Sequence, residues 1–533
     1  ARDIFLVWLV DLATMWWQAR STSQSWRWLR PAFFSRAVGR GVFPSVAATW
    51  LAFETFHAPL FAEDHASVMA NGLPDASRSG TVYMWGKRAA IPVQSGDRGE
   101  GDVRNPTEIK WFRLHAEEHG CQWRQLAFGP TFGVARTDTG SLYMWGGGRR
   151  SGTPRALVLH SEPLTLFRDV QCSEATVWAV TADGRVAVWE RFVDTLMEGA
   201  DLEGRILGHI EPVHEMAVGC SHAAFLTVDH HVYCLGSNRY GQCGVDPMDQ
   251  QTVPVCSEVI LPRLAGAVSH VACGRHHTVA LTESGQCYSW GDDSKIQLGL
   301  GDTRSNFGDE RAYEKPMSSF ASKPPPAPST ATTKYGEFQP HYQWRPTPTQ
   351  HIPLEFQRQV HGTPYPPPDG VLCGHEFTAL IVRDSPDWYP LEEETCRVFS
   401  CGENMQGQCG RSLQSMQQTF AAVKLPRNSK IDSISCGADH CVTVLRRMDT
   451  PRKREVWSWG SNSNGQAGGN CTGSVCPAAR LRLPREVRVE AAWCGSRNSA
   501  AICSQRAQKP RASPVSEACA TTAPDPDSAD VPR

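Results

Sequence analysis

Short apolar segments alternate with polar, glycine-containing turns between about residue 80 and residue 503. One such unit, from Ala272 to Gly291, reads ACGRHHTVALTESGQCYSWG. It predicts a β-hairpin: an apolar strand over Thr278–Leu281, a turn over Thr282–Gly285, and an apolar-aromatic strand that ends in Trp-Gly. Glycine in the turn permits the positive φ that tight hairpins need. The pattern favours a β-rich, loop-rich fold over a helical bundle.

The hairpin unit recurs, and a recurring unit determines the architecture before any local assignment does. The Trp-Gly half occurs seven times, ending at Trp85-Gly86, Trp145-Gly146, Trp189-Glu190, Leu235-Gly236, Trp290-Gly291, Cys401-Gly402 and Trp459-Gly460. The Cys-Gly half also occurs seven times, around Gly129, Ser173, Gly219, Gly274, Gly374, Gly437 and Gly495. In four units the halves lie 17 residues apart, as from Gly274 to Gly291. Chance similarity would scatter this spacing.

The two half-motifs, their spacing and their copy number resemble the regulator of chromosome condensation repeat family. The resemblance covers about four-fifths of the chain and implies an all-β fold, a seven-bladed β-propeller. The first unit has only its Trp-Gly half (81–86) and the last has only its Cys-Gly half (494–503). We therefore predict that the two ends share one blade and close the ring, which protects the sheet edges.

The repeat residues are predicted to pack blades together rather than to carry chemistry. The repeat histidine is present at His222, His277 and His440, but the matching positions hold Phe132, Thr176, Phe377 and Asn498. Such drift is expected of packing residues and would damage a set of catalytic ligands. The residues predicted to have this structural role are Trp85, Gly86, Trp145, Gly146, Trp189, Gly219, His222, Gly236, Gly274, His277, Trp290, Gly291, Gly374, Gly402, Gly437, His440, Trp459, Gly460 and Gly495.

Residues 1–79 form an apolar N-terminal extension that we predict to be helical. Residues 1–50 contain six arginines, six tryptophans and no lysine, and an arginine-rich, acid-poor composition is typical of a mitochondrial transit region. Residues 42–62 are long enough to span a bilayer but include Glu54 and His57, so a membrane span, an interfacial or partner-buried segment, and a helix packed on the propeller all remain open. The residues predicted to anchor the extension are Trp8, Trp16, Trp17, Trp26, Arg27, Trp28 and Trp50.

Two other segments are predicted to lie outside the propeller. Residues 303–370 contain 13 prolines, which predicts a proline-rich surface insertion, acting as a spacer or as a ligand for an aromatic groove, and argues against a sheet there. Residues 504–533 contain few apolar residues and are predicted to be disordered. The propeller is therefore assigned to residues 80–503, interrupted at 303–370.

Composition excludes several functions. Lys and Arg total 53 and Asp and Glu total 55, for a net charge of -2, so no direct nucleic-acid binding is predicted. The 19 cysteines include no Cys-x-x-Cys pair, and we interpret most of them as small buried hydrophobes in a reducing compartment. No phosphate-binding loop, Gly-x-Ser-x-Gly elbow or His-Glu-x-x-His helix occurs. We predict no catalytic residue, no cofactor and no metal site.

Three classes of function remain. The first is a non-enzymatic scaffold, assembly factor or accessory subunit, bound to other proteins of a large mitochondrial complex in the matrix or at the inner membrane through residues 1–79. The family resemblance implies the second, a guanine-nucleotide exchange factor for a small GTPase, which would be nuclear or cytoplasmic. The third, also implied by the resemblance, is an ultraviolet photoreceptor, as in the plant branch of the family. It is disfavoured because that branch uses a repeated Gly-Trp-Arg-His-Thr motif, and the nearest stretch here, 274–278, lacks the tryptophan.

Overall fold

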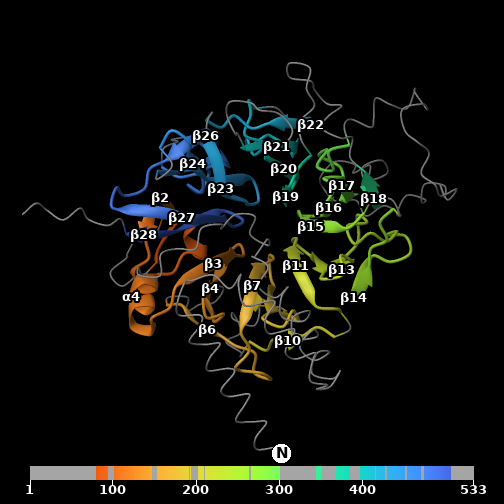
Figure 1. Cartoon of the computed structure of the whole chain (residues 1–533), viewed down its shortest axis with the longest axis horizontal. Coiled ribbons are helices and arrows are strands. Elements are labelled where there is room, and N and C mark those ends of the chain that lie inside the picture. The colour runs from red at the N-terminus through yellow and green to blue at the C-terminus, as the bar shows by residue number, and fades with distance from the viewer. Residues whose placement is uncertain are drawn as a thin grey trace, which may run out of the picture. The chain divides into compact units, whose positions relative to one another are not determined.

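Seven four-stranded antiparallel sheets surround a common centre in the computed structural model (Figure 1). The predicted seven-bladed propeller is confirmed. The residues that the structure describes are 80–93, 101–146, 153–190, 192–193, 202–208, 210–262, 266–300, 344–350, 367–383, 396–413, 416–426, 429–450, 453–469 and 473–505.

Each blade is numbered here along the chain and written from its innermost strand outward. Blades 1 to 3 are β3(Trp123–Phe128), β4(Phe132–Thr137), β5(Leu142–Gly146), β6(Arg155–Leu157); β7(Phe167–Cys172), β8(Val177–Thr181), β9(Val186–Trp189), β10(Arg205–Ile206); and β11(Val213–Val218), β12(His222–Thr227), β13(Val232–Ser237), β14(Thr252–Glu258). Blades 4 to 6 are β15(Val268–Cys273), β16(His277–Thr282), β17(Cys287–Asp292), β18(Trp344–Gln350); β19(Gly370–Cys373), β20(Phe377–Arg383), β21(Cys396–Glu403), β22(Met416–Ala422); and β23(Ser429–Cys436), β24(His440–Arg447), β25(Arg454–Ser461), β26(Val475–Leu481). Blade 7 is β27(Val487–Cys494), β28(Asn498–Gln505), β1(Thr81–Gly86), β2(Val103–Glu108).

The register of the two middle strands explains the fixed spacing of the half-motifs. In blade 4, His277 opens β16 directly opposite Gly291 near the end of β17, and in blade 6 His440 lies opposite Gly460 in the same way. Every residue of β12 and β16 is buried. A strand covered on both faces reads as a continuous apolar run rather than an alternating one, and this is the pattern seen in the sequence.

The ring closes through blade 7, as predicted from the unequal ends of the repeat. Strand β1 pairs with β28 along its whole length, from Thr81 opposite Cys503 to Gly86 opposite Asn498. The Thr81 hydroxyl also donates to the Cys503 carbonyl at 3.0 Å. Segments more than 400 residues apart therefore form one sheet, and the closure prediction is confirmed.

The prediction that no sheet forms within 303–370 is wrong for part of that segment. Residues Trp344–Gln350 form β18, which pairs with β17 as the outermost strand of blade 4, and Gly370 begins β19. The prolines of β18, Pro346 and Pro348, sit on an edge strand, the one place in a sheet where a residue without a backbone N–H costs no ladder bond. Proline content alone therefore misidentified a strand as insertion.

A helix that the sequence did not suggest lies between blades 7 and 1. The helix α4(Lys110–His119) buries Phe112 and Ala116, and it ends at Gly120, whose φ of 63° is left-handed. The Phe112 ring contacts Trp123 and Trp145 edge to face, with centroids 4.8 and 5.4 Å apart. The helix covers an apolar flank of blade 1 that would otherwise face water.

The predictions for the N-terminal extension concern residues outside the described ranges, and so do those for the tail beyond residue 505. Within the described ranges, no helix has both the length and the apolar character to cross a membrane. Fifteen cysteines in these ranges are free thiols, whereas Cys476 on β26 is disulfide-bonded, which the odd cysteine count did not lead us to expect.

Ring closure should control solubility. Deleting residues 494–503 removes most of β28 and leaves β1 and β27 as unpaired edges, so we expect the shortened protein to aggregate and to lose cooperative unfolding. Size-exclusion chromatography and a thermal melt measure both properties. A soluble shortened protein with one sharp transition would contradict this role of blade 7.

Candidate functional site: the mouth of the central channel

A four-residue loop links the inner strand of each blade to its second strand, and in three blades it reads Gly-x-x-His. In blade 4 the His277 ring lies directly over the glycine, so that a Cβ at Gly274 would collide with it. A Cβ at Gly219 would also meet the Gly274 carbonyl oxygen of the next blade. Glycine is therefore required at Gly219 and Gly274 because the space that a side chain would need is occupied.

Three of the seams between blades share one chain of hydrogen bonds. The histidine Nε2 donates to a hydroxyl of the following blade: His222 to Thr278 (2.9 Å), His277 to Thr378 (3.0 Å) and His440 to Ser499 (2.8 Å). Each hydroxyl donates in turn to the backbone carbonyl of a glutamine in the blade that carries the histidine: Gln242 (2.8 Å), Gln297 (2.6 Å) and Gln466 (2.9 Å). Because the hydroxyl already donates its hydrogen bond to the carbonyl, it can only accept from the histidine. The neutral histidine must therefore carry its hydrogen on Nε2.

The tryptophans of the Trp-Gly motif donate to glutamine backbone carbonyls of the preceding blade, and for Gln242 and Gln466 these are the carbonyls that the hydroxyls also reach. The indole Nε1 atoms donate to glutamine carbonyls in three seams: Trp290 to Gln242 (2.9 Å), Trp459 to Gln408 (3.0 Å) and Trp85 to Gln466 (2.9 Å). Trp145 donates to the Ala90 carbonyl at 2.8 Å instead. Buried indoles need such a partner, so each of these tryptophans fixes a loop of the preceding blade.

The departures from the repeat histidine come in matched pairs. Wherever the histidine is absent, the position after the motif in the next blade also lacks a hydroxyl: Phe377 with Cys441, Phe132 with Val177, Thr176 with Ala223 and Asn498 with Gly133. Phe377 and Cys441 belong to one buried cluster, and so do Phe132 and Val177. These two seams are therefore apolar. The Thr176 hydroxyl instead bonds Ser173 within its own loop, and the amide atoms of Asn498 are buried without a hydrogen-bond partner among the described residues.

Burial keeps the seam histidines neutral. It lowers the pKa of His222 to about 3 and that of His440 to about 4. Within the described residues, the Nδ1 atoms of both rings are buried and accept no hydrogen bond. A charged imidazolium is therefore unfavourable at either seam.

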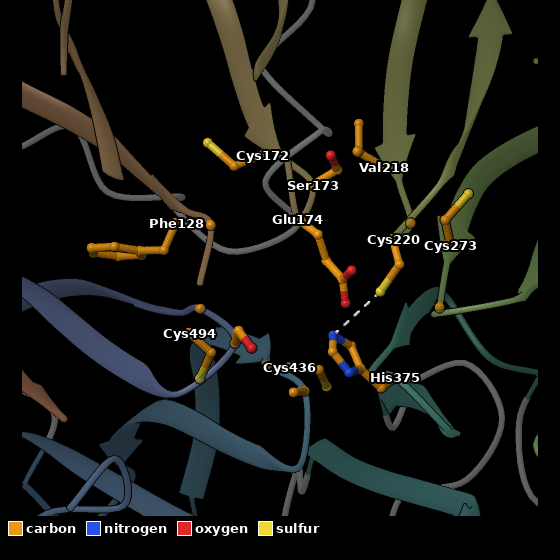
Figure 2. A pocket seen from close by; sticks show the side chains of 18 of the residues that line it. Phe128, Cys172, Ser173, Glu174, Val218, Cys220, Cys273, His375, Cys436 and Cys494 are labelled. Atoms are coloured by element: carbon orange, nitrogen blue, oxygen red, sulfur yellow. Dashed lines mark hydrogen bonds between the residues drawn. The ribbon is translucent and has the colours of Figure 1, made fainter. Parts of the chain in front are cut away.

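The first of the two residues after the glycine surrounds the mouth of a central pocket in six of the seven blades (Figure 2). The pocket has a volume of about 120 Å³, and all seven blades contribute to its lining. Residues from the first of the two positions that line it are Pro130, Glu174, Cys220, His375, Ala438 and Ser496. The mouth is polar where blades 2, 3 and 5 meet it and carries small or apolar residues elsewhere.

Cys220 and His375 meet at this mouth, with Sγ and Nε2 3.6 Å apart and the Glu174 carboxylate directed toward them (Figure 2). Burial, followed by the Glu174 charge, holds the pKa of the Cys220 thiol well above its usual range. Burial and the Arg275 charge lower the pKa of His375 to about 4. Both groups are therefore neutral near pH 7, and the thiol is not activated as a nucleophile.

Two of these loops carry a carboxylate at the second position, Glu376 and Asp439, outside the residues that line the pocket. Burial, then the neighbouring Asp292, raises the pKa of Glu376 to about 7. Its carboxylate accepts a hydrogen bond from Gln297 Nε2 at 3.0 Å and lies 3.7 Å from the Arg275 guanidinium. Burial also raises the pKa of Asp439. In the described part of the chain, no three His, Cys, Asp or Glu side chains are placed to hold a metal ion.

Backbone hydrogen bonds join neighbouring loops at the mouth. The Arg275 N–H donates to the His375 carbonyl at 2.9 Å, and the His375 N–H donates to the Ala438 carbonyl at 3.0 Å. The loops of blades 4, 5 and 6 therefore hold one another in place. The side chains that they present to the pocket are fixed on a rigid support.

The sequence matches a family model described as "Regulator of chromosome condensation (RCC1) repeat" over residues 229–281 and 397–444. A second model of the same repeat matches residues 268–297. Over these residues the chain resembles the RCC1 repeat family. These matches fall on blades 3 to 6, where the seam chain of histidine, hydroxyl and glutamine is best developed.

The curated proteins that this chain is similar to differ in how much of their length is matched. The Ultraviolet-B receptor UVR8 of Arabidopsis thaliana is 23% identical over 406 residues, 73% of this chain and 74% of that protein. The X-linked retinitis pigmentosa GTPase regulator of Homo sapiens is 39% identical over 92 residues, which is 17% of this chain and 9% of that protein.

Solved structures share the fold. Yeast RCC1 (Prp20), crystallised with Kap60, has a TM-score of 0.60 at 14% identity, covering 84% of this chain and 92% of that one. Human WBSCR16 has a TM-score of 0.56 at 16% identity, covering 80% of this chain and all of that one.

The structure places the selected tryptophans and histidines in the seams, whereas five of the selected glycines also line the pocket: Gly219, Gly274, Gly374, Gly437 and Gly495. Trp85, Trp145, Trp189, Trp290 and Trp459 are among the largest fully buried side chains. The Trp-Gly glycines have positive φ, as at Gly291 (109°), where a Cβ would meet the His276 carbonyl oxygen. Sequence reasoning missed the residues of the mouth because they differ between blades. Their only signal was the constant interval between glycine and histidine.

The seam chain predicts coupling between His222 and Thr278. His222→Phe removes one hydrogen bond, and Thr278→Cys leaves the His222 Nε2 proton with a weak acceptor, so each change should cost about 1–2 kcal/mol of unfolding free energy. The double variant reproduces the Phe377 and Cys441 seam and should recover about 1 kcal/mol. Urea denaturation of the four proteins measures the coupling. Strict additivity would show that the pair acts independently.

The neutral seam histidines also predict a pH dependence. An unfolded histidine has a pKa near 6.5, whereas His222 has one of about 3 in the fold, so only the unfolded state takes up this proton as the pH falls from 6.5 toward 4. Stability should therefore fall with pH, by about 1.4 kcal/mol per unit for each such histidine. The His222→Phe/Thr278→Cys variant should lose stability less steeply by that amount in urea titrations from pH 7 to 4.5. Parallel curves would contradict the low pKa.

Proposed function

We propose that this RCC1-repeat protein acts by binding other proteins and that the channel mouth is its main contact face. The main support for this proposal is a contrast within the Gly-x-x-His loops and their equivalents. Their first and last residues are buried in the seams, whereas the two residues between them vary from blade to blade. A rigid support with variable side chains is the arrangement expected of a binding surface.

The chemistry of the mouth supports binding rather than bond making. Cys220 and His375 are both neutral near pH 7, and a neutral, buried thiol is a poor nucleophile. Glu376 and Arg275 instead offer charges of both signs to a partner. Among related propellers, the yeast RCC1 (Prp20) structure contains Kap60, and a second Prp20p structure is described with binding properties to Gsp1p and histones.

The mouth should therefore control which proteins are captured. Replacing Glu174, Arg275 and His375 together by alanine removes the varied polar groups, and we expect at least tenfold less partner in affinity purification with mass spectrometry. The matched control replaces Arg447, Lys453 and Arg482 by alanine, at the opposite ends of the strands. Loss of partners in the control but not in the mouth variant would contradict the proposed face.

We further propose that the protein works within a large mitochondrial assembly, in the matrix or at the inner membrane, and that residues 1–79 attach it there. The support is the arginine-rich, lysine-free, acid-poor composition of residues 1–50. Deleting 1–79 should release the protein from its assembly. Deleting residues 303–343, which spares β18, should have a weaker effect.

Localisation tests this second proposal directly. We expect the tagged full-length protein to fractionate with mitochondria, and carbonate extraction then separates the subcases, because release into the supernatant excludes a spanning helix. A nuclear or cytosolic signal for the full-length protein would overturn the mitochondrial assignment.

Guanine-nucleotide exchange is the alternative function. Its support is the 39% identity over 92 residues with a protein named as a GTPase regulator, together with the charged mouth. The full-length protein, added at substoichiometric concentration to a panel of small GTPases loaded with fluorescent GDP, distinguishes the two functions. Accelerated nucleotide release that the mouth variant loses would replace the scaffold proposal, and unchanged release would support it.

A further inference from the structure

Two cysteines of blade 6 face each other across a hairpin close to the channel. Cys436 ends β23 and lies directly opposite Cys441 on β24, and their sulfur atoms are 3.5 Å apart. The next pair inward is hydrogen-bonded, with the Gly437 N–H donating to the His440 carbonyl at 2.8 Å. The cysteines therefore occupy a non-hydrogen-bonded pair, where Cα atoms approach to about 4.5 Å, a separation that a disulfide can span.

The same two positions in other blades carry one thiol and one hydroxyl. Cys273 and Cys373 lie 3.9 Å from the hydroxyls of Thr278 and Thr378, and Cys494 lies opposite Ser499. In blade 6 the hydroxyl position holds Cys441, the partner of Phe377 in the matched pairs described above. The other blades thus supply natural controls with nearly identical geometry but no second sulfur.

The first sulfur can be reached from solvent through the pocket. Cys436 is partly exposed and lines the pocket at the channel mouth (Figure 2), whereas Cys441 is only 1% exposed. A volume of about 120 Å³ admits molecules of the size of water or hydrogen peroxide, since a water occupies roughly 30 Å³. A small oxidant would therefore meet Cys436 before Cys441.

We propose that Cys436 and Cys441 form a reversible disulfide when hydrogen peroxide enters the channel mouth. The Cys436 sulfur attacks one peroxide oxygen and releases its own proton, which the leaving oxygen takes up. The O–O bond breaks, the second oxygen leaves as hydroxide and becomes water, and Cys436 becomes a sulfenic acid. The Cys441 sulfur then attacks the Cys436 sulfur, the S–O bond breaks, and the released hydroxide takes the Cys441 proton as a second water. Overall, two thiols and one hydrogen peroxide give one disulfide and two waters.

The two cysteines have different roles in this reaction. Burial, reinforced by the contact with Cys436, holds the pKa of the Cys441 thiol well above its usual range. Cys441 therefore stays protonated and unreactive in the reduced protein, and it attacks only once the oxidised Cys436 sulfur lies beside it. The bridge closes a loop of six residues, and such a short loop adds little to overall stability, so it modifies the channel wall without locking the fold.

The pair can be read out in one peptide. Trypsin cuts after Lys430 and Arg446, so the peptide 431–446 contains Cys436 and Cys441 and no other cysteine. The full-length native protein is treated with hydrogen peroxide, alkylated, digested and analysed by mass spectrometry. We expect this peptide to lack both alkyl groups and to be lighter by two hydrogen atoms than the reduced peptide, and dithiothreitol to restore two alkylated thiols.

Two variants separate the geometry from general thiol oxidation. Cys441→Thr gives blade 6 the arrangement of blades 4 and 5, and Cys436 should then accumulate as a sulfenic acid that dimedone traps. Thr378→Cys gives blade 5 a second pair with Cys373, which should oxidise as the native pair does. Thermal melts confirm that each variant is folded, and Cys436→Ala replaces Cys441→Thr if the latter is not.

Two results would overturn the proposal. The first is full alkylation of both thiols in peptide 431–446 of the folded wild type. The peroxide concentration must be one that oxidises Cys436 in the Cys441→Thr variant. If Cys436→Ala is used instead of that variant, the concentration must be one that oxidises the other pocket-lining cysteines. The second is a bridge from Cys436 to Cys494, on the adjacent strand β27, in place of Cys441.

Discussion

One backbone carbonyl at each polar seam determines how neighbouring blades fit together. The Gln242 carbonyl receives the Thr278 hydroxyl at 2.8 Å and the Trp290 indole N–H at 2.9 Å, both from the next blade. Within the described residues the seven sheets share no backbone ladder with one another, so the distance and angle between them are defined by side chains together with backbone hydrogen bonds between loops. Buried polar groups have to be paired. Removing one member of this series of hydrogen bonds leaves the others without a partner, so substitutions in the seam must occur together.

This constraint separates two kinds of position within a stretch of four residues. The glycine and the histidine of each motif are held by the seam, and the two residues between them are not. Glu174, Cys220 and His375 can therefore differ in chemistry while lying at equivalent places around one channel. A propeller that obeys this division can change its binding surface without altering its fold, which is why we assign function to the mouth and stability to the seams.

The departures from the repeat follow the same logic and have a chemical consequence. Phe377 needs no hydroxyl from blade 6, and Cys441 stands where other blades carry threonine or serine. The change that makes this seam apolar also brings a second sulfur to within 3.5 Å of Cys436. The packing of this seam explains why Cys441 is present, and its sulfur then forms a dithiol with Cys436. Blades 4, 5 and 7 cannot form such a pair because they carry threonine or serine at this position.

The sequence by itself determined the number of blades, the closure of the ring and the burial of the repeat tryptophans, because each of these is a local pattern repeated at fixed spacing. Strand β18 was missed because its prolines argue against a strand unless the strand is known to lie at an edge. Helix α4 was missed because one short helix has no repeat to reveal it. The side chains that follow the repeat glycine at the mouth were also beyond the sequence, since they come from six distant loops and share no residue type. Only the tertiary structure brings Cys220 to His375 and places Cys436 at the central pocket, because those neighbours are set by the ring and not by proximity along the chain.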